Sequence, residues 1–110
     1  MRRLDLYQPE LGASPKVDDC WRLHDNIAGD GTWTVSGWVQ RTLATYGTCA
    51  VGVQSGTLEL FKVGNGDIRA LMRDSIQKFG GAGVVGAAGR MECQVVGVGT
   101  TTVYWGIYHT

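Results

Sequence analysis

Residues 63–80, VGNGDIRALMRDSIQKFG, decide the fold class, because they predict a long amphipathic helix with a clear start and stop. Asn65 or Asp67 can cap its N-terminus, and Gly80 is a typical residue at a C-terminal stop. Between these ends, apolar residues recur at three- and four-residue spacing: Ile68, Leu71, Met72, Ile76 and Phe79. This spacing places them on one helical face, which we expect to pack against another layer.

A shorter helix is expected upstream. Ser14 followed by Pro15 is a helix-start signal, and Gly29 is a stop signal. An apolar stripe lies between these two signals: Val17, Cys20, Trp21, His24 and Ile27. Two amphipathic helices in one short chain predict a shared surface that both of them cover.

Segments of alternating polarity supply that surface. Residues 3–7 (RLDLY) are a candidate for a short edge strand, and four further strands are expected at residues 32–39 (TWTVSGWV), 43–53 (LATYGTCAVGV), 89–96 (GRMECQVV) and 101–109 (TTVYWGIYH). The sequence therefore predicts an α+β two-layer sandwich, ferredoxin-like or closely related. Both helices would pack on one face of a four- or five-stranded antiparallel sheet. A chain of 110 residues forms one domain, here residues 14–110, after an N-terminal segment of residues 1–13.

Strand parity assigns side chains to the two faces of this sheet. The helix-covered face is expected to take Val35, Cys49, Val51, Val53, Met91, Cys93, Val95, Val103, Trp105 and Ile107. The other face takes polar residues, as expected beside solvent. It also takes four large aromatic residues: Trp38, Tyr46, Tyr104 and Tyr108. These rings are either a binding surface for a sugar, a lipid headgroup or a protein, or a second small core beneath another segment.

Charge and motif content exclude several classes of function. Ten basic and ten acidic residues balance without forming a run, so the footprint of nucleic-acid binding is absent, and no apolar stretch is long enough to span a membrane. The three cysteines and two histidines lack the spacing of a metal site, so we expect no bound metal. The sequence has no cofactor-binding or catalytic motif, so we expect a protein that binds no cofactor and is not an enzyme. The first residues, MRRLDLYQPELG, lack a secretory signal, which fits either a cytosolic protein or a mature secreted chain.

The three cysteines, Cys20, Cys49 and Cys93, leave at least one without an internal partner. Cys20 and His24 share a helical face, so a thiol hydrolase that uses them is one alternative, although both lie on the apolar stripe. Cys49 and Cys93 lie mid-strand with inward parity. They form either a disulfide between neighbouring strands or two buried free thiols.

Several segments, in this order, resemble the fungal Ecp2 effector family, the homologues of extracellular protein two, described as necrosis-inducing factors. They are Asp-Cys at 19–20, Gly-Thr-Cys at 47–49, Gly-Asn-x-Asp-Ile at 64–68, Gly-x-Met-x-Cys at 89–93 and the aromatic strand at 103–109. The resemblance covers residues 14–109. It implies a small secreted protein, similar to virally encoded killer toxins, that acts without catalysis on host or competitor cells.

The resemblance also carries expectations for the sites. It implies that Cys49 and Cys93 are oxidised to a disulfide. Family members carry another cysteine upstream of the Asp-Cys pair, and this chain has none there. Cys20 is then a free thiol, or bridges two chains into a homodimer, or pairs with Cys49 or Cys93. The target would be a protein or a glycan on a cell surface, met by the four aromatic residues. The family's fusions to chitinases make a module that binds chitin or cell-wall glycan the alternative function.

Overall fold

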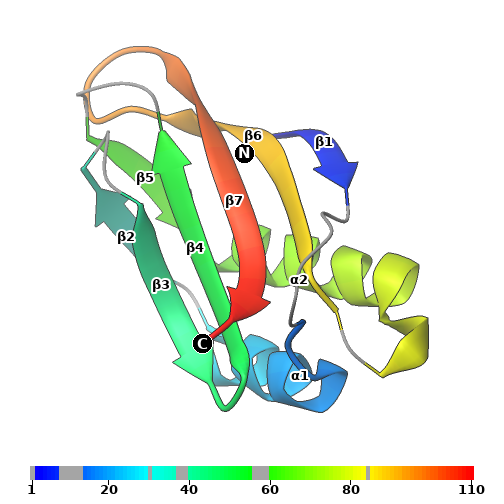
Figure 1. Cartoon of the computed structure of the whole chain (residues 1–110). Helices are drawn as coiled ribbons and strands as arrows, with labels where there is room; N and C mark the ends of the chain where they lie inside the picture. The colour runs from blue at the N-terminus through cyan, green and yellow to red at the C-terminus, as the bar shows by residue number, and fades with distance from the viewer. Residues whose placement is uncertain (1, 8–13, 30, 37–39, 56–59, 84) are drawn as a thin grey trace.

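The computed structural model is an α+β protein whose two helices lie on one side of its main sheet (Figure 1). The structure describes residues 2–7, 14–29, 31–36, 40–55, 60–83 and 85–110. The strands are β1 (Arg2–Tyr7), β2 (Thr32–Val35), β3 (Arg41–Tyr46), β4 (Cys49–Ser55), β5 (Phe61–Gly64), β6 (Ala87–Gln94) and β7 (Thr100–His109). The helices are α1 (Val17–Asn26), α2 (Asn65–Phe79) and the short 3-10 helix η1 (Gly80–Ala82).

The main sheet has five antiparallel strands in the order β1-β6-β7-β4-β3. Its central pairing joins β4 to β7, two strands that are far apart in the sequence. We call the face that carries α1 and α2 the inner face, and the opposite face, turned toward the viewer in Figure 1, the outer face. No described helix or strand lies over the outer face (Figure 1). The predicted two-layer sandwich, with both helices on one face, is confirmed.

The strands expected from the sequence were wrong in three places, the first of which is β5, a strand that was not predicted. Residues 43–53 do not form one strand but a hairpin, in which Tyr46 pairs with Cys49 across the turn Gly47–Thr48. Gly47 has a φ of 55°, which glycine adopts at little cost, and this allows the tight reversal. Within residues 32–39, Thr32–Val35 pairs with β5 in a separate two-stranded sheet, and Trp38 lies outside the described residues.

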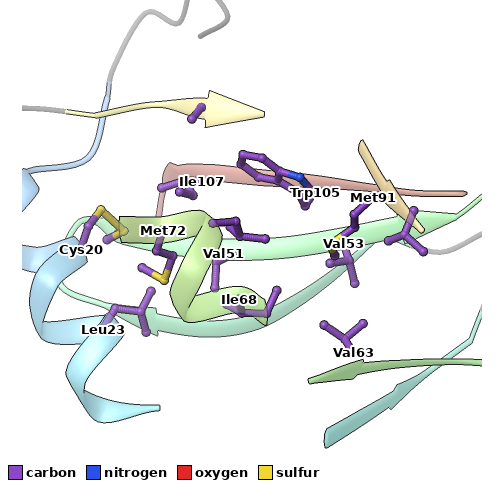
Figure 2. Packing of buried hydrophobic residues seen from close by; sticks show 14 of the residues in the cluster. Cys20, Leu23, Val51, Val53, Val63, Ile68, Met72, Met91, Trp105 and Ile107 are labelled. Atoms are coloured by element: carbon purple, nitrogen blue, oxygen red, sulfur yellow. A yellow bond between two sulfur atoms is a disulfide. The ribbon is translucent and has the colours of Figure 1, made fainter. Parts of the chain in front are cut away.

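The core is formed as the parity argument predicts. All ten residues assigned to the inner face are buried, with exposed fractions of 4% or less. Leu23 on α1 and Ile68, Leu71 and Met72 on α2 pack into the same cluster. Figure 2 shows Leu23, Ile68 and Met72 reaching from the helices toward the sheet, with the Cys20 disulfide at one end of the cluster and Val63 toward the other.

Both helix starts differ from the expectation for a physical reason. Helix α1 begins at Val17, because the Pro15 carbonyl accepts a hydrogen bond from the Val85 N–H and the chain enters the helix only afterwards. Helix α2 begins at Asn65, but Asn65 does not cap it. Its side-chain amide donates to the Ile27 carbonyl at 3.0 Å and so fastens the start of α2 to the end of α1. Gly80 is the residue after the last turn of α2, as predicted.

Candidate binding face and its disulfide anchor

The disulfide joins Cys20 on α1 to Cys49 at the start of β4, with a Cα–Cα distance of 5.2 Å, and Cys93 is a buried free thiol. The expected Cys49–Cys93 pair is therefore wrong, and so is a free or intermolecular Cys20. Strand β7 lies between β4 and β6, so Cys49 and Cys93 are two strand spacings apart, about 9–10 Å. They also face positions eight residues apart along β7, His109 and Thr101. Cα atoms that are more than about 7 Å apart cannot be bridged.

A polar contact lies directly beside this disulfide. Asp19 Oδ2 accepts hydrogen bonds from the Thr48 backbone N–H at 2.9 Å and from the Thr48 hydroxyl at 2.7 Å. The same hydroxyl accepts the Lys16 N–H at 2.9 Å, at the first residue before α1. The two hydrogen bonds from Thr48 lower the pKa of Asp19 below its ordinary value of 3.8. The start of α1 is therefore fixed to the β3–β4 turn by one covalent bond and three hydrogen bonds.

The disulfide removes the nucleophile from the Cys20–His24 pair. A sulfur bonded to Cys49 is not a thiol, so the expected alternative of a thiol hydrolase at Cys20 is wrong. His24 is buried, with Nδ1 3.0 Å from Asp25 Oδ1 and its ring edge-on to Trp21 at a centroid distance of 5.2 Å. Burial, with a smaller contribution from the neighbouring Asp67, raises the pKa of the remaining thiol, Cys93, to about 12. At neutral pH this thiol stays protonated.

The structure brings together two of the four predicted aromatic residues. Tyr104 and Tyr108 both lie on the outer face of β7, and Tyr104 is 53% exposed. Tyr46 is exposed, but it pairs directly with Cys49, and directly opposite residues in an antiparallel pair point to the same face. Tyr46 therefore lies on the inner face at the sheet edge, away from the pair. The position of Trp38 lies outside the described residues.

Tyr108 leans across the outer face instead of standing away from it. A methyl group added to Gly52 would lie 2.5 Å from the Tyr108 Oη, and one added to Gly106 would lie 3.4 Å from Cδ1 of the same ring. The Tyr108 hydroxyl shares a hydrogen bond of 2.6 Å with the hydroxyl of Thr42 on β3. Since β4 separates β7 from β3, the side chain crosses β4 completely. Only glycine at position 52 leaves room for this, whereas a methyl group at position 106 would touch the ring at an ordinary contact distance.

A shallow hollow of about 180 Å³ lies on the outer face beside the two tyrosines. Gly52 and Gly106, which pair with each other, are part of its lining, and Gln54 stands directly opposite Tyr104 in the register. Among the described residues, those that line it are Gln40, Gly52, Val53, Gln54, Tyr104, Trp105, Gly106 and Tyr108. None of these residues carries a charge, so the hollow combines aromatic, amide and backbone groups.

The glycines and glutamines of this site were not predicted from the sequence. A signal was available, because Gly52 and Gly106 occupy outward positions in the middle of predicted strands, where glycine marks a close approach of another group. Their pairing across β4 and β7 is not visible in the sequence. Within the described part of the chain, no cluster of three or more metal-ligating side chains is found, and no helix has the length and apolar character that a bilayer crossing requires.

Comparisons with known proteins match the sequence of this chain to a family. The family model Hce2, described as "Pathogen effector; putative necrosis-inducing factor", matches residues 5–93. The fungus Penicillium expansum has a protein named "Probable chitinase LysM18" that is 41% identical over 107 residues. The match covers 93% of this chain but 7% of that protein, so the chain corresponds to a small part of a much longer relative.

Proposed function

Because the chain belongs to the Hce2 family of pathogen effectors, we propose that it is a secreted, non-enzymatic effector that binds a target on host or competitor cells through its outer face. The observation that carries this proposal is the open outer face. On this face Tyr104 and Tyr108 line a hollow that no described element covers. Large exposed aromatic side chains on an otherwise polar sheet are typical of contact surfaces.

Secretion is supported by the Cys20–Cys49 disulfide. Such bonds form and persist in oxidising compartments and are rare in the cytosol. The bond also supports a stabilising role for the cysteines: it ties helix α1 to the β3–β4 hairpin in a domain with a modest core.

Action without catalysis is supported by the state of the thiols. Cys20 is oxidised, and Cys93 is 1% exposed with a pKa raised to about 12, so neither sulfur is available as a nucleophile. The family description, pathogen effector, names an action on another organism and no reaction. A binding role at the outer face agrees with both observations.

A second candidate function is binding of chitin. It is favoured by the relative whose printed name is that of a chitinase, in which a segment similar to this chain forms a small part of a long protein. A module of this size beside a chitinase would hold the protein on its polymeric substrate. Co-sedimentation of the oxidised protein with insoluble chitin, compared with cellulose, tests this candidate directly.

The proposed function is tested by applying the purified, oxidised protein to plant tissue and to cultures of competing fungi, and by measuring cell death and growth. We expect Tyr104→Ala and Tyr108→Ala to lose the effect. Tyr46→Ala, an exposed tyrosine on the inner face, serves as the matched control and should act like the wild type. Equal activity of all three variants would rule out the outer face as the contact surface.

A further inference from the structure

We infer that the hollow between Tyr104 and Tyr108 is a subsite for one pyranose ring of an uncharged, β-1,4-linked polysaccharide chain. This inference rests on the proposed function, because it names the class of target that the outer face would bind. It is carried by the placement of the two tyrosines, by the glycine pair and by the neutral lining.

The orientation of the Tyr108 side chain is fixed on the outer face. The side chain lies along the sheet, with Cδ1, Cε1 and Oη as the atoms nearest to Gly52 and Gly106, and is held at its far end by Thr42. The ring is half-buried and lines the hollow. A pyranose whose substituents are all equatorial presents a flat patch of C–H groups, and the negative face of an aromatic ring attracts such C–H groups.

Tyr104 forms a second aromatic wall of the hollow. Tyr104 is four residues before Tyr108 on the same strand, so both side chains leave the same face, with Gly106 between them. Tyr104 is 53% exposed and stands at the other end of the hollow. The spacing of four strand residues, about 13 Å, suits two contacts along one extended chain better than one small ligand.

Two of the side chains that line the hollow are neutral amides. Gln54 and Gln40 each offer an amide that both donates and accepts hydrogen bonds, which matches hydroxyl and acetamido groups. None of the described residues that line the hollow is charged, so this lining offers no ion pair to a phosphate or a carboxylate. Arg90 lies opposite Tyr104 on β6 but does not line the hollow, and it has interactions of its own. An uncharged glycan is the ligand class that this lining fits.

The test is a titration of the isotopically labelled, oxidised protein with soluble hexasaccharides, followed by backbone amide NMR. Chitohexaose and cellohexaose represent β-1,4 chains, laminarihexaose a β-1,3 chain, maltohexaose an α-1,4 chain, and hexagalacturonate an anionic chain. We expect a β-1,4 hexamer to shift the amide signals of Gly52, Gly106 and Tyr104 and to bind more tightly than the other three. Tyr104→Ala should weaken binding about tenfold, the loss of one aromatic contact, while Tyr46→Ala leaves it unchanged.

The position of Tyr108 has its own variant. Thr42→Val keeps the shape of residue 42 but removes the hydroxyl that holds the ring, so it should weaken glycan binding without changing the unfolding temperature by more than a few degrees. The inference is overturned if neither β-1,4 hexamer binds, if one of the other three chains binds best, or if Tyr46→Ala reduces binding as much as Tyr104→Ala. If Tyr104→Ala abolishes the effect on cells although no glycan binds, the inference fails and the proposed function stands. If a glycan binds at Tyr104 but the protein has no effect on cells, the proposed function fails and the inference stands.

Discussion

The Asp19 carboxylate binds Thr48 through both its backbone N–H and its hydroxyl, directly beside the disulfide between Cys20 and Cys49. The Asp-Cys pair of the first helix therefore contacts the Gly-Thr-Cys triplet of the hairpin: Asp19 binds Thr48, and Cys20 is bonded to Cys49. Gly47 belongs to the same contact, because a methyl group added there would lie 2.6 Å from Asp19 Oδ2. Two short motifs that are 29 residues apart thus form a single joint between helix and sheet.

This joint should weaken in acid. The pKa of Asp19 is lowered in the folded protein by the hydrogen bonds from Thr48, so its contribution to stability is fully present above the unfolded-state value of 3.8. The contribution is lost as the pH falls through the lowered pKa. We expect Asp19→Asn to lower the unfolding temperature at pH 7, and the difference from the wild type to shrink below pH 3.8. Thermal unfolding followed by circular dichroism across this pH range measures the effect.

The control for this experiment is Asp18→Asn. Asp18 is the exposed neighbour of Asp19, on the same first turn of α1. Its replacement changes the charge of the protein by the same amount without touching Thr48. A constant difference between wild type and Asp19→Asn from neutral to strongly acid pH would contradict the role assigned to the Asp19 carboxylate.

The cysteine assignment predicts a specific count of alkylated thiols by intact mass. In the native protein, iodoacetamide should add to no cysteine, because Cys93 is 1% exposed and its pKa is raised to about 12. Denaturation without reductant should expose Cys93 alone, and reduction should expose all three cysteines. Peptide mapping then identifies the labelled residue. Labelling of Cys20 before reduction would refute the pairing.

Removing the disulfide should destabilise the domain strongly. The loop that it closes has a sequence separation of 29, and the chain-entropy relation gives a loss of about 3–4 kcal/mol for a loop of this length. Urea unfolding of the Cys20→Ser, Cys49→Ser double variant measures this change in free energy. Cys93→Ala, which leaves the disulfide intact, should cost clearly less. Equal losses in the two proteins would show that the bond is not a main support of the fold.

Gly52→Ala should destabilise the sheet itself. The added methyl group would lie 2.5 Å from the Tyr108 Oη and 2.8 Å from the backbone oxygen of Arg41. The side chain can move, but the backbone of β3 cannot move without breaking its pairing, so a loss of about 1–3 kcal/mol is expected. Tyr108 should lose its hydrogen bond to Thr42 in the same variant. Urea unfolding gives the free energy, and the Tyr108 ring signals in NMR report its displacement.

Gly66→Ala is the matched glycine control. Gly66 lies in α2 with no heavy atom within 4 Å of an added methyl group and with an ordinary φ. Alanine there should stabilise the protein, by about 0.4–1 kcal/mol, because it reduces the freedom of the unfolded chain. If Gly52→Ala behaved like Gly66→Ala, Tyr108 would not lie over β4 as described.

Much of the fold was predictable, because the signals involved are local. The apolar stripe of residues 68–79 defined the buried face of α2, and the inner residues that the period of two named on β4, β6 and β7 are all buried. The errors occurred where two local signals competed. Residues 43–53 have the composition of one strand, but Gly47 turns them into a hairpin, and Ser14–Pro15 signals a helix that in fact starts at Val17.

The sequence by itself determined much of the buried core and the inner side of β4, β6 and β7, because these properties depend on the spacing of neighbours along the chain. The order of the strands was decided only in the tertiary structure, since it depends on contacts between distant segments. In that order β7 lies between β4 and β6, which separates Cys49 from Cys93. Cys49 forms its disulfide with Cys20 instead. The same order also places the two glycines beneath Tyr108, and so creates the hollow on the outer face.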